Sequence, residues 1–116
     1  MRTTNQQLLA AIRDLQKASK KYDAEIWAAL AEDLAHPKHR RATVNLSHIS
    51  RILKEGETAA VPGKVLGAGN LNGRSVAAFC FSEVARKKIE NAGGECISLE
   101  ALVQKNPRGS GVRIVG

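Results

Sequence analysis

The spacing of apolar residues changes near the middle of the chain, and this change constrains the fold more than any other feature of the sequence. Up to about residue 56, large aliphatic residues recur three or four positions apart, which is typical of one face of an amphipathic helix. Beyond that point they form short runs such as RSVAAFCFS at 74–82, which favour buried strands. The pattern therefore predicts a domain that combines helices with a sheet.

Capping and breaking residues bound the helices expected in the first part of the chain. Thr4 with Gln7 resembles a capping box at the start of a first helix. Asp23 is expected to cap a second helix, which must stop before Pro37 because the residue before proline disfavours the α conformation. We expect a third, short helix to start at Asn45 and to stop at Gly56.

The second part of the chain is predicted to alternate strands and helices. Strands are expected at 58–61, 74–82, 95–98 and 111–116, and helices at 83–92 and 99–105. Ser82 and Ser98 are placed to cap the two helices, and Val84 is expected to face inward with Ala85 and Ile89. This order predicts an α/β fold in which N-terminal helices pack on a small α/β unit. Residues 1–116 suit one domain, with a mostly helical part at 1–56 and an α/β part at 57–116.

The stretch VPGKVLGAGNLNGR at 61–74 holds four glycines, with Lys64 and Arg74 each following one of them. It lacks the GK[ST] ending of a Walker A loop and the spacing of the dinucleotide fingerprint, and it leads into an expected strand instead of a helix. No nucleotide cofactor is therefore expected. Two alternatives remain: a loop that approaches a nucleic-acid backbone closely, or a connection whose glycines only ease its turns.

Positive charge is concentrated in three segments. The chain has a formal net charge of +7 and a pI of about 9.9, which indicates an acidic partner. Residues 36–54 contain five lysines and arginines and no acidic residue, and 74–88 and 106–113 are also predominantly basic. His48 and Arg51 are expected one helical turn apart on a shared face, and Arg40 and Arg41 are adjacent. Guanidinium groups bind phosphate oxygens in pairs, so these segments favour RNA-backbone recognition.

The sequence offers little for catalysis, metal binding or membrane insertion. His36 and His39 have H-x-x-H spacing but no cysteine or acidic neighbour, so we expect neither a metal site nor a catalytic residue. Cys80 and Cys96 form no disulfide framework and are expected to be small buried residues of a cytosolic protein. No apolar run approaches the roughly 20 residues of a membrane helix.

Two alternative functions stay open on the residues alone. One is a small nucleotide-binding enzyme that uses the glycine stretch at 61–74 as a phosphate cradle. The other is a free RNA- or DNA-binding regulator, although the basic segment 36–54 has no aromatic residue on which bases could stack.

Four motifs together resemble a family of archaeal and eukaryotic large-subunit ribosomal proteins, number eighteen of the "e" series. They are AHPKHRRATVNLSHIS, VPGKVLGAGNL, FSEVARKKIENAGGE and NPRGSGVRIV. The resemblance implies an α/β domain with irregular β-β-α turns, related in fold to bacterial large-subunit protein fifteen. It also implies a non-enzymatic, structural role in the cytoplasmic ribosome, with large-subunit ribosomal RNA and neighbouring ribosomal proteins as partners and no small-molecule substrate.

The resemblance and the charge pattern together define the expected RNA-binding residues. His48 departs from the arginine or lysine expected at that position of the family. The full set is Lys38, His39, Arg40, Arg41, Asn45, His48, Arg51, Gly63, Lys64, Gly67, Arg74, Arg108 and Arg113.

Overall fold

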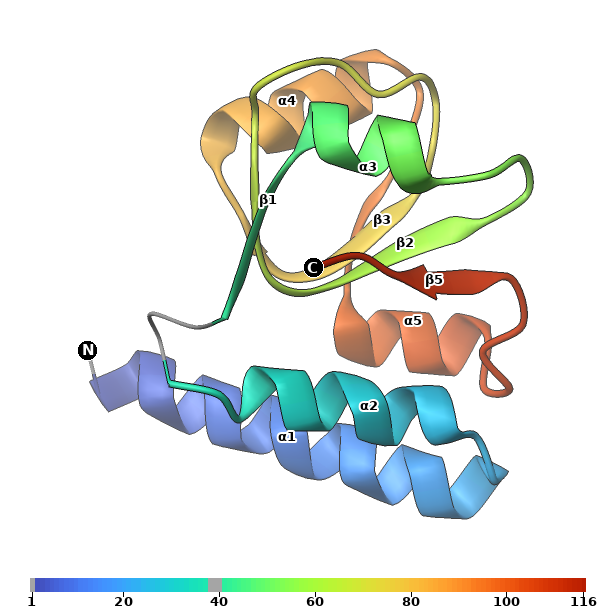
Figure 1. Cartoon of the computed structure of the whole chain (residues 1–116). Coiled ribbons are helices and arrows are strands. Elements are labelled where there is room, and N and C mark those ends of the chain that lie inside the picture. Colours follow the sequence, from blue (N-terminus) through green and yellow to red (C-terminus); the bar gives the residue numbers. More distant parts are fainter. Residues whose placement is uncertain (1, 38–40) are drawn as a thin grey trace.

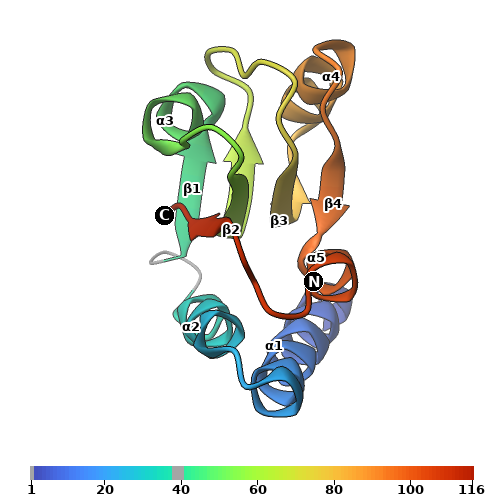
Figure 2. The same cartoon turned by 90° about the vertical axis from the view of Figure 1, so that its right-hand side faces the viewer.

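The computed structural model describes residues 2–37 and 41–116 and has three layers, with a parallel sheet between two layers of helices. One face of the sheet carries α1 (Arg2–Tyr22), α2 (Glu25–Leu34) and α5 (Leu99–Lys105), and the other carries α3 (Leu46–Ile52) and α4 (Glu83–Asn91). The strands are β1 (Ala42–Asn45), β2 (Thr58–Leu66), β3 (Val76–Phe81), β4 (Cys96–Ser98) and β5 (Val112–Ile114). Figures 1 and 2 show the sheet between the two helical layers. The expected α/β class is confirmed.

Every strand pair in the sheet is parallel among the described residues, and β2 is its centre. The order is β1-β2-β3-β4, and β5 also pairs with β2. β5 contacts the beginning of β2, at 58–60, whereas β1 contacts its end, at 63–66. These two short strands therefore follow one another along the same edge of β2.

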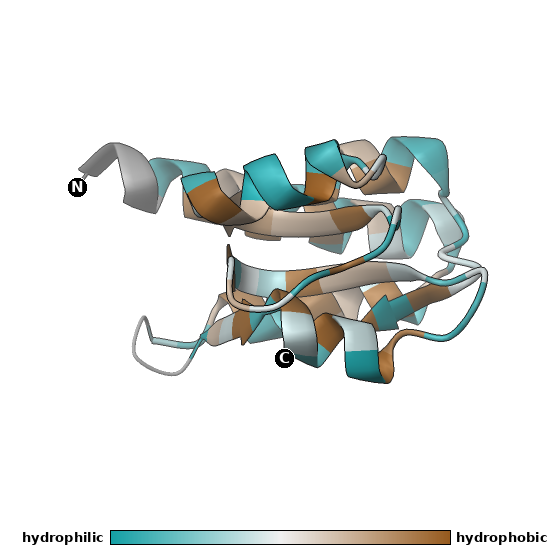
Figure 3. Ribbon diagram, turned by 90° about the horizontal axis from the view of Figure 1, so that it is seen from above, coloured by the Kyte–Doolittle hydropathy of each residue, from teal (hydrophilic) through white to brown (hydrophobic). Residues whose placement is uncertain are grey.

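Two apolar cores hold the layers together. Alternate residues of β2 enter different cores: Val61 packs with the α3 and α4 side chains, and Ala60 packs with α1, α2 and α5, as expected for a strand covered on both faces. Trp27 and Leu30 are completely buried in the second core. Figure 3 shows apolar ribbon along the strands and recurring polar residues along the helices, which indicates that the helices turn their apolar stripes toward the sheet.

Residues 67–75 connect two parallel neighbouring strands, β2 and β3, without a helix. A connection between parallel neighbouring strands normally contains a helix, and the apolar face of that helix covers the sheet. Here Leu71, only 5% exposed, enters the core between the sheet and the helices α3 and α4. The second half of the glycine stretch is therefore a crossover that one leucine anchors.

Local signals predicted most of the second half correctly. Ser82 and Ser98 cap α4 and α5, and the side-chain oxygen of each accepts a hydrogen bond from the backbone N–H three residues on, at 3.1 and 3.0 Å. The expected break at Asn106 follows α5 directly. Val84 is wrongly predicted to be buried, since it is 57% exposed.

The first half contains a strand that the sequence pattern did not predict. β1 lies in the basic segment, and its short alternation of exposed Thr43 and buried Val44 gives a weak strand signal.

Two further predictions are wrong. Asp23 does not cap α2, whose N-cap is Ala24; instead it has a φ of 54° at the turn after α1. Cys80 is exposed instead of buried.

Candidate nucleic-acid interface

Pairing of β1 with β2 brings together the first basic motif and the lysine of the glycine stretch. Ala42 lies opposite Gly63 and Thr43 lies opposite Lys64 in the parallel register. Arg41, half-buried and just before β1, therefore lines the same pocket as the exposed Lys64, 23 positions later in the chain. The pocket has a volume of about 270 Å³, and Thr43, Phe79 and Cys80 contribute to its walls.

Gly63 lies inside β2 because β1 approaches it too closely for a side chain. A Cβ atom built at this position would clash with the carbonyl oxygen of Ala42. The register shift between β2 and β3 falls between Val61 and Lys64, next to the same glycine. The prediction that the strand ends at Val61 is therefore wrong: β2 continues to Leu66, so the first half of the glycine stretch belongs to the central strand.

The glycine loop, residues 67–75 after β2, is held by hydrogen bonds within the chain. Ala68 donates its N–H to the side-chain oxygen of Asn45, 3.2 Å away, and its carbonyl accepts from the N–H of Ser47, 3.1 Å away. Lys88 of α4 donates to the carbonyl oxygens of Gly67 and Gly69, at 2.8 and 3.0 Å.

These contacts also account for the glycines of the loop. A Cβ on Gly67 would lie 2.5 Å from a methyl carbon of Val84. Gly69 has a φ of 91°, and a Cβ at that position would clash with Ser47. A phosphate cradle requires free backbone N–H groups, but the N–H of Ala68 is already bonded. The geometry thus favours a packed connection over a nucleotide cradle.

Arg74 and Arg113 have internal partners at the opposite end of β2. Arg113 forms a two-point ion pair with Glu57, with nitrogen–oxygen distances of 2.9 and 3.0 Å. Arg74 donates to the carbonyl oxygens of Lys54 and Glu57. The hydrogen bonds from Arg113, followed by the one from the N–H of Lys54, lower the pKa of the Glu57 carboxyl to about 2. Both arginines hold the turn between α3 and β2.

The other predicted residues lie at separate places on the surface. On α3, Arg51 is exposed and His48 is half-buried. Arg108 is exposed in the turn after α5, where it lines a hollow of about 480 Å³ with Lys21 and Lys105. Three further predicted residues, Lys38, His39 and Arg40, lie outside the described residues.

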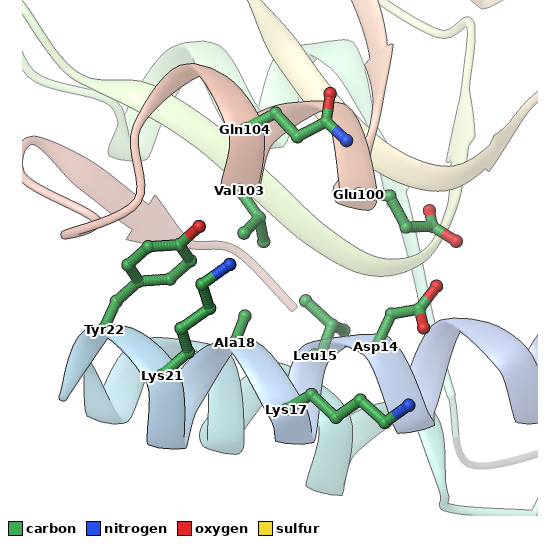
Figure 4. Close-up of a pocket in the computed structure, with 9 residues that line it drawn as sticks. All are labelled: Asp14, Leu15, Lys17, Ala18, Lys21, Tyr22, Glu100, Val103 and Gln104. Atoms are coloured by element: carbon green, nitrogen blue, oxygen red, sulfur yellow. The ribbon is translucent and has the colours of Figure 1, made fainter.

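A third hollow, of about 320 Å³, lies between α1 and α5 and has a different charge pattern (Figure 4). Leu15 and Val103 form part of an apolar wall, and Lys21 lies at one end with Tyr22. The carboxylates of Asp14 and Glu100 lie at the other end. Because these carboxylates repel phosphate, this hollow is a poorer candidate for RNA than the pocket at Arg41 and Lys64.

Two aromatic residues lie near the basic groups and were not predicted as part of the interface. Phe79 lines the pocket with Arg41 and Lys64, and the Arg86 guanidinium lies 5.2 Å from the centre of the Phe81 ring. Both phenylalanines lie on β3, in the apolar first part of the basic segment 74–88. Only the pairing of β3 with β2 brings Phe79 to the pocket of Arg41 and Lys64. The apolar run containing them was visible in the sequence, but its neighbours were not.

Two other kinds of feature, a metal site and a membrane-spanning helix, have no counterpart within residues 2–37 and 41–116. No group of three or more histidine, cysteine or acidic side chains is arranged to hold a metal ion there. Among the same residues, each helix is either too short or too polar to span a bilayer.

Comparison with known proteins gives consistent matches over nearly the whole chain. The profile of a family described as ribosomal protein 60S L18 and 50S L18e matches residues 3–115. The protein from Methanothermobacter thermautotrophicus named large ribosomal subunit protein eL18 is 48% identical over 113 residues, covering 97% of this chain and 93% of the relative. The protein of the same name from Archaeoglobus fulgidus is 45% identical over 116 residues, covering 99% of both chains.

Proposed function

This chain belongs to the ribosomal protein family 60S L18 and 50S L18e, and from that premise we propose that it is a structural constituent of the large ribosomal subunit that binds large-subunit ribosomal RNA. It acts by neutralising phosphates where RNA segments pack together. Its partners are this RNA and the neighbouring ribosomal proteins, and catalysis is not part of its role.

The observation that carries the RNA-binding proposal is the pairing of Arg41 and Lys64 around one pocket. Arg41 directly precedes β1 and Lys64 lies in β2, and none of the residues that line their pocket is acidic. Two neighbouring cations without a nearby carboxylate attract a polyanion more strongly than a mixed surface does. Pairing of β1 with β2 fixes the backbone at Thr43 and Lys64, so this part of the interface needs no backbone ordering when RNA binds.

The remaining predicted residues divide into two groups in this proposal. Phosphate contacts are assigned to the side chains that lack an acidic partner within the described part of the chain, and to the segment that leads into Arg41. This set is Lys38, His39, Arg40, Arg41, His48, Arg51, Lys64 and Arg108. The residues with internal contacts shape the interface from within. They are Asn45, Gly63, Gly67, Arg74 and Arg113.

A titration of RNA binding against salt tests the proposal. The double variant Arg41→Ala with Lys64→Ala should bind large-subunit ribosomal RNA more weakly. Its plot of log affinity against log salt should be flatter by about 0.7–0.9 for each phosphate that the variant no longer neutralises. The charge-matched control, Arg13→Ala with Lys17→Ala, removes two exposed cations from α1 and should keep the original slope. An unchanged slope in the first variant would contradict the proposed contacts.

Two further measurements separate this function from its alternatives. Co-sedimentation with large ribosomal subunits is expected for a structural constituent, whereas a wholly free pool would favour an independent RNA-binding regulator. Calorimetry with ATP, GTP and NAD should detect no specific binding. A saturable heat with any of these nucleotides would favour a nucleotide-using enzyme.

A further inference from the structure

We propose that the pocket between Arg41 and Lys64 receives a single unpaired base of the ribosomal RNA, with Phe79 as the aromatic wall against which the base packs. The inference rests on the proposed RNA-binding function and goes one step further. It assigns to this pocket a contact with a base, where charge alone would provide contacts only with phosphates.

The size of the pocket fits one ring system. Its volume of about 270 Å³ lies just below the roughly 300–1,000 Å³ of pockets that hold drug-sized ligands. A whole nucleotide with its phosphates would therefore extend beyond the pocket, whereas a base can enter it. The backbone carrying that base would then lie at the rim, within reach of the two cations.

The wall of the pocket supplies an aromatic surface at a fixed position. Phe79 is half-buried, and part of its ring packs against the core formed with α1, α2 and α5. A ring held in this way loses little freedom when a second ring packs on its open side. Stacking of bases on aromatic side chains is the common device for holding unpaired nucleotides, and it tolerates any base.

Polar groups at the same pocket suit the edge and the backbone of a nucleotide. Thr43 is exposed and offers a hydroxyl group that can both donate and accept a hydrogen bond. Arg41 and Lys64 supply positive charge from two neighbouring segments of the chain. Bases of an RNA duplex are inaccessible in its narrow major groove, so proteins reach bases mainly in loops and bulges. An extruded base is thus the ligand that matches an apolar pocket between cations.

Filling the pocket without changing its charge gives the first test. Thr43→Trp adds a bulky ring beside Lys64 but keeps both cations. It should weaken binding to in vitro transcribed large-subunit ribosomal RNA roughly 10-fold, in line with the loss of one stacked base, at an unchanged salt slope. Ala29→Trp, on the exposed side of α2, is the control for adding a tryptophan and should bind normally. An affinity for Thr43→Trp within twofold of the wild type would overturn the inference.

Ultraviolet cross-linking gives a second test that needs no change to the pocket. Cys80 is exposed at the pocket wall, and a thiol or a phenyl ring in contact with a base forms a covalent adduct on irradiation. In the RNA complex of the Cys96→Ser variant, peptides carrying Cys80 or Phe79 should bear a nucleobase. Adducts found only elsewhere would overturn base insertion. The proposed function would survive that result, because RNA binding itself is measured independently by the salt titration.

Discussion

The indole Nε1 of Trp27 donates a hydrogen bond to the carbonyl oxygen of Pro107, with a donor–acceptor distance of 2.8 Å. This bond joins the completely buried side chain of α2 to the turn that follows α5, 80 positions later. Asn106 closes the same turn through hydrogen bonds to the backbone of Ser110 at 2.6 and 3.3 Å. The exposed Arg108 is therefore presented on a rigid turn.

Replacing Trp27 by phenylalanine should destabilise the protein and loosen this turn. The change leaves the Pro107 carbonyl without its donor and creates a small void in the core. Together, the lost hydrogen bond and the void should lower the free energy of unfolding by about 1–3 kcal/mol. Urea denaturation measures the loss, and hydrogen exchange at residues 108–111 measures the loosening. Wild-type stability in Trp27→Phe would show that the hydrogen bond is dispensable.

Local signals explain why α4 and α5 could be predicted from the sequence. Ser82 and Ser98 act on backbone N–H groups three residues away, so the information that starts each helix lies within a few positions of it. The break at Asn106 and Pro107 is equally local. The family resemblance was also carried by contiguous motifs, and the family matched over residues 3–115 confirms it.

The pocket could not be predicted, because it depends on which strands pair and in which register. The contact between Thr43 and Lys64 across two strands arises only after β1 aligns with β2. The role of Gly63 has the same origin, since the backbone of Ala42 is what excludes a side chain there. The exposure of Cys80 was missed because burial declines toward the carboxyl end of β3, although the residues in the run stay apolar.

Two glycine-to-alanine changes should separate steric exclusion from backbone strain. Gly63→Ala places a methyl group against the Ala42 carbonyl, so it should cost several kcal/mol or displace β1. Gly56→Ala meets no atom within 4 Å, but Gly56 has a φ of 81°, so only the conformational cost of about 1 kcal/mol applies. Thermal and urea unfolding of both variants check this order. Equal losses would show that β1 does not constrain position 63.

The stability of the glycine loop should depend on Lys88 but not on its neighbour Lys87. Lys88 donates to the carbonyl oxygens of Gly67 and Gly69, whereas Lys87 is exposed without a hydrogen-bonded partner among the described residues. Lys88→Met should lower the free energy of unfolding by about 1 kcal/mol and speed hydrogen exchange in 67–73. Lys87→Met removes the same charge and should change stability by less than about 0.5 kcal/mol. Matching exchange rates in the two variants would contradict this role.

The ion pair between Glu57 and Arg113 should make the free energy of unfolding depend on pH between about 4.5 and 2. Hydrogen bonds from Arg113 and from the N–H of Lys54 lower the pKa of the Glu57 carboxyl from 4.5 to about 2. A group whose pKa falls on folding binds fewer protons in the folded state than in the unfolded state. Its contribution is therefore complete above pH 4.5 and is lost as the pH falls toward 2.

Comparison with Glu57→Gln isolates this contribution from other carboxyl groups. Glutamine retains an oxygen that can accept a hydrogen bond from Arg113, but it has no charge to lose. The wild type should be the more stable protein at pH 6, and the gap between the two should shrink steadily between pH 4.5 and pH 2, because protonation then removes the same charge from the wild type. Urea denaturation at pH 6, 4, 3 and 2 measures the gap. A gap that stays constant over this range would mean that Glu57 keeps an ordinary pKa and that its contact with Arg113 adds nothing through charge.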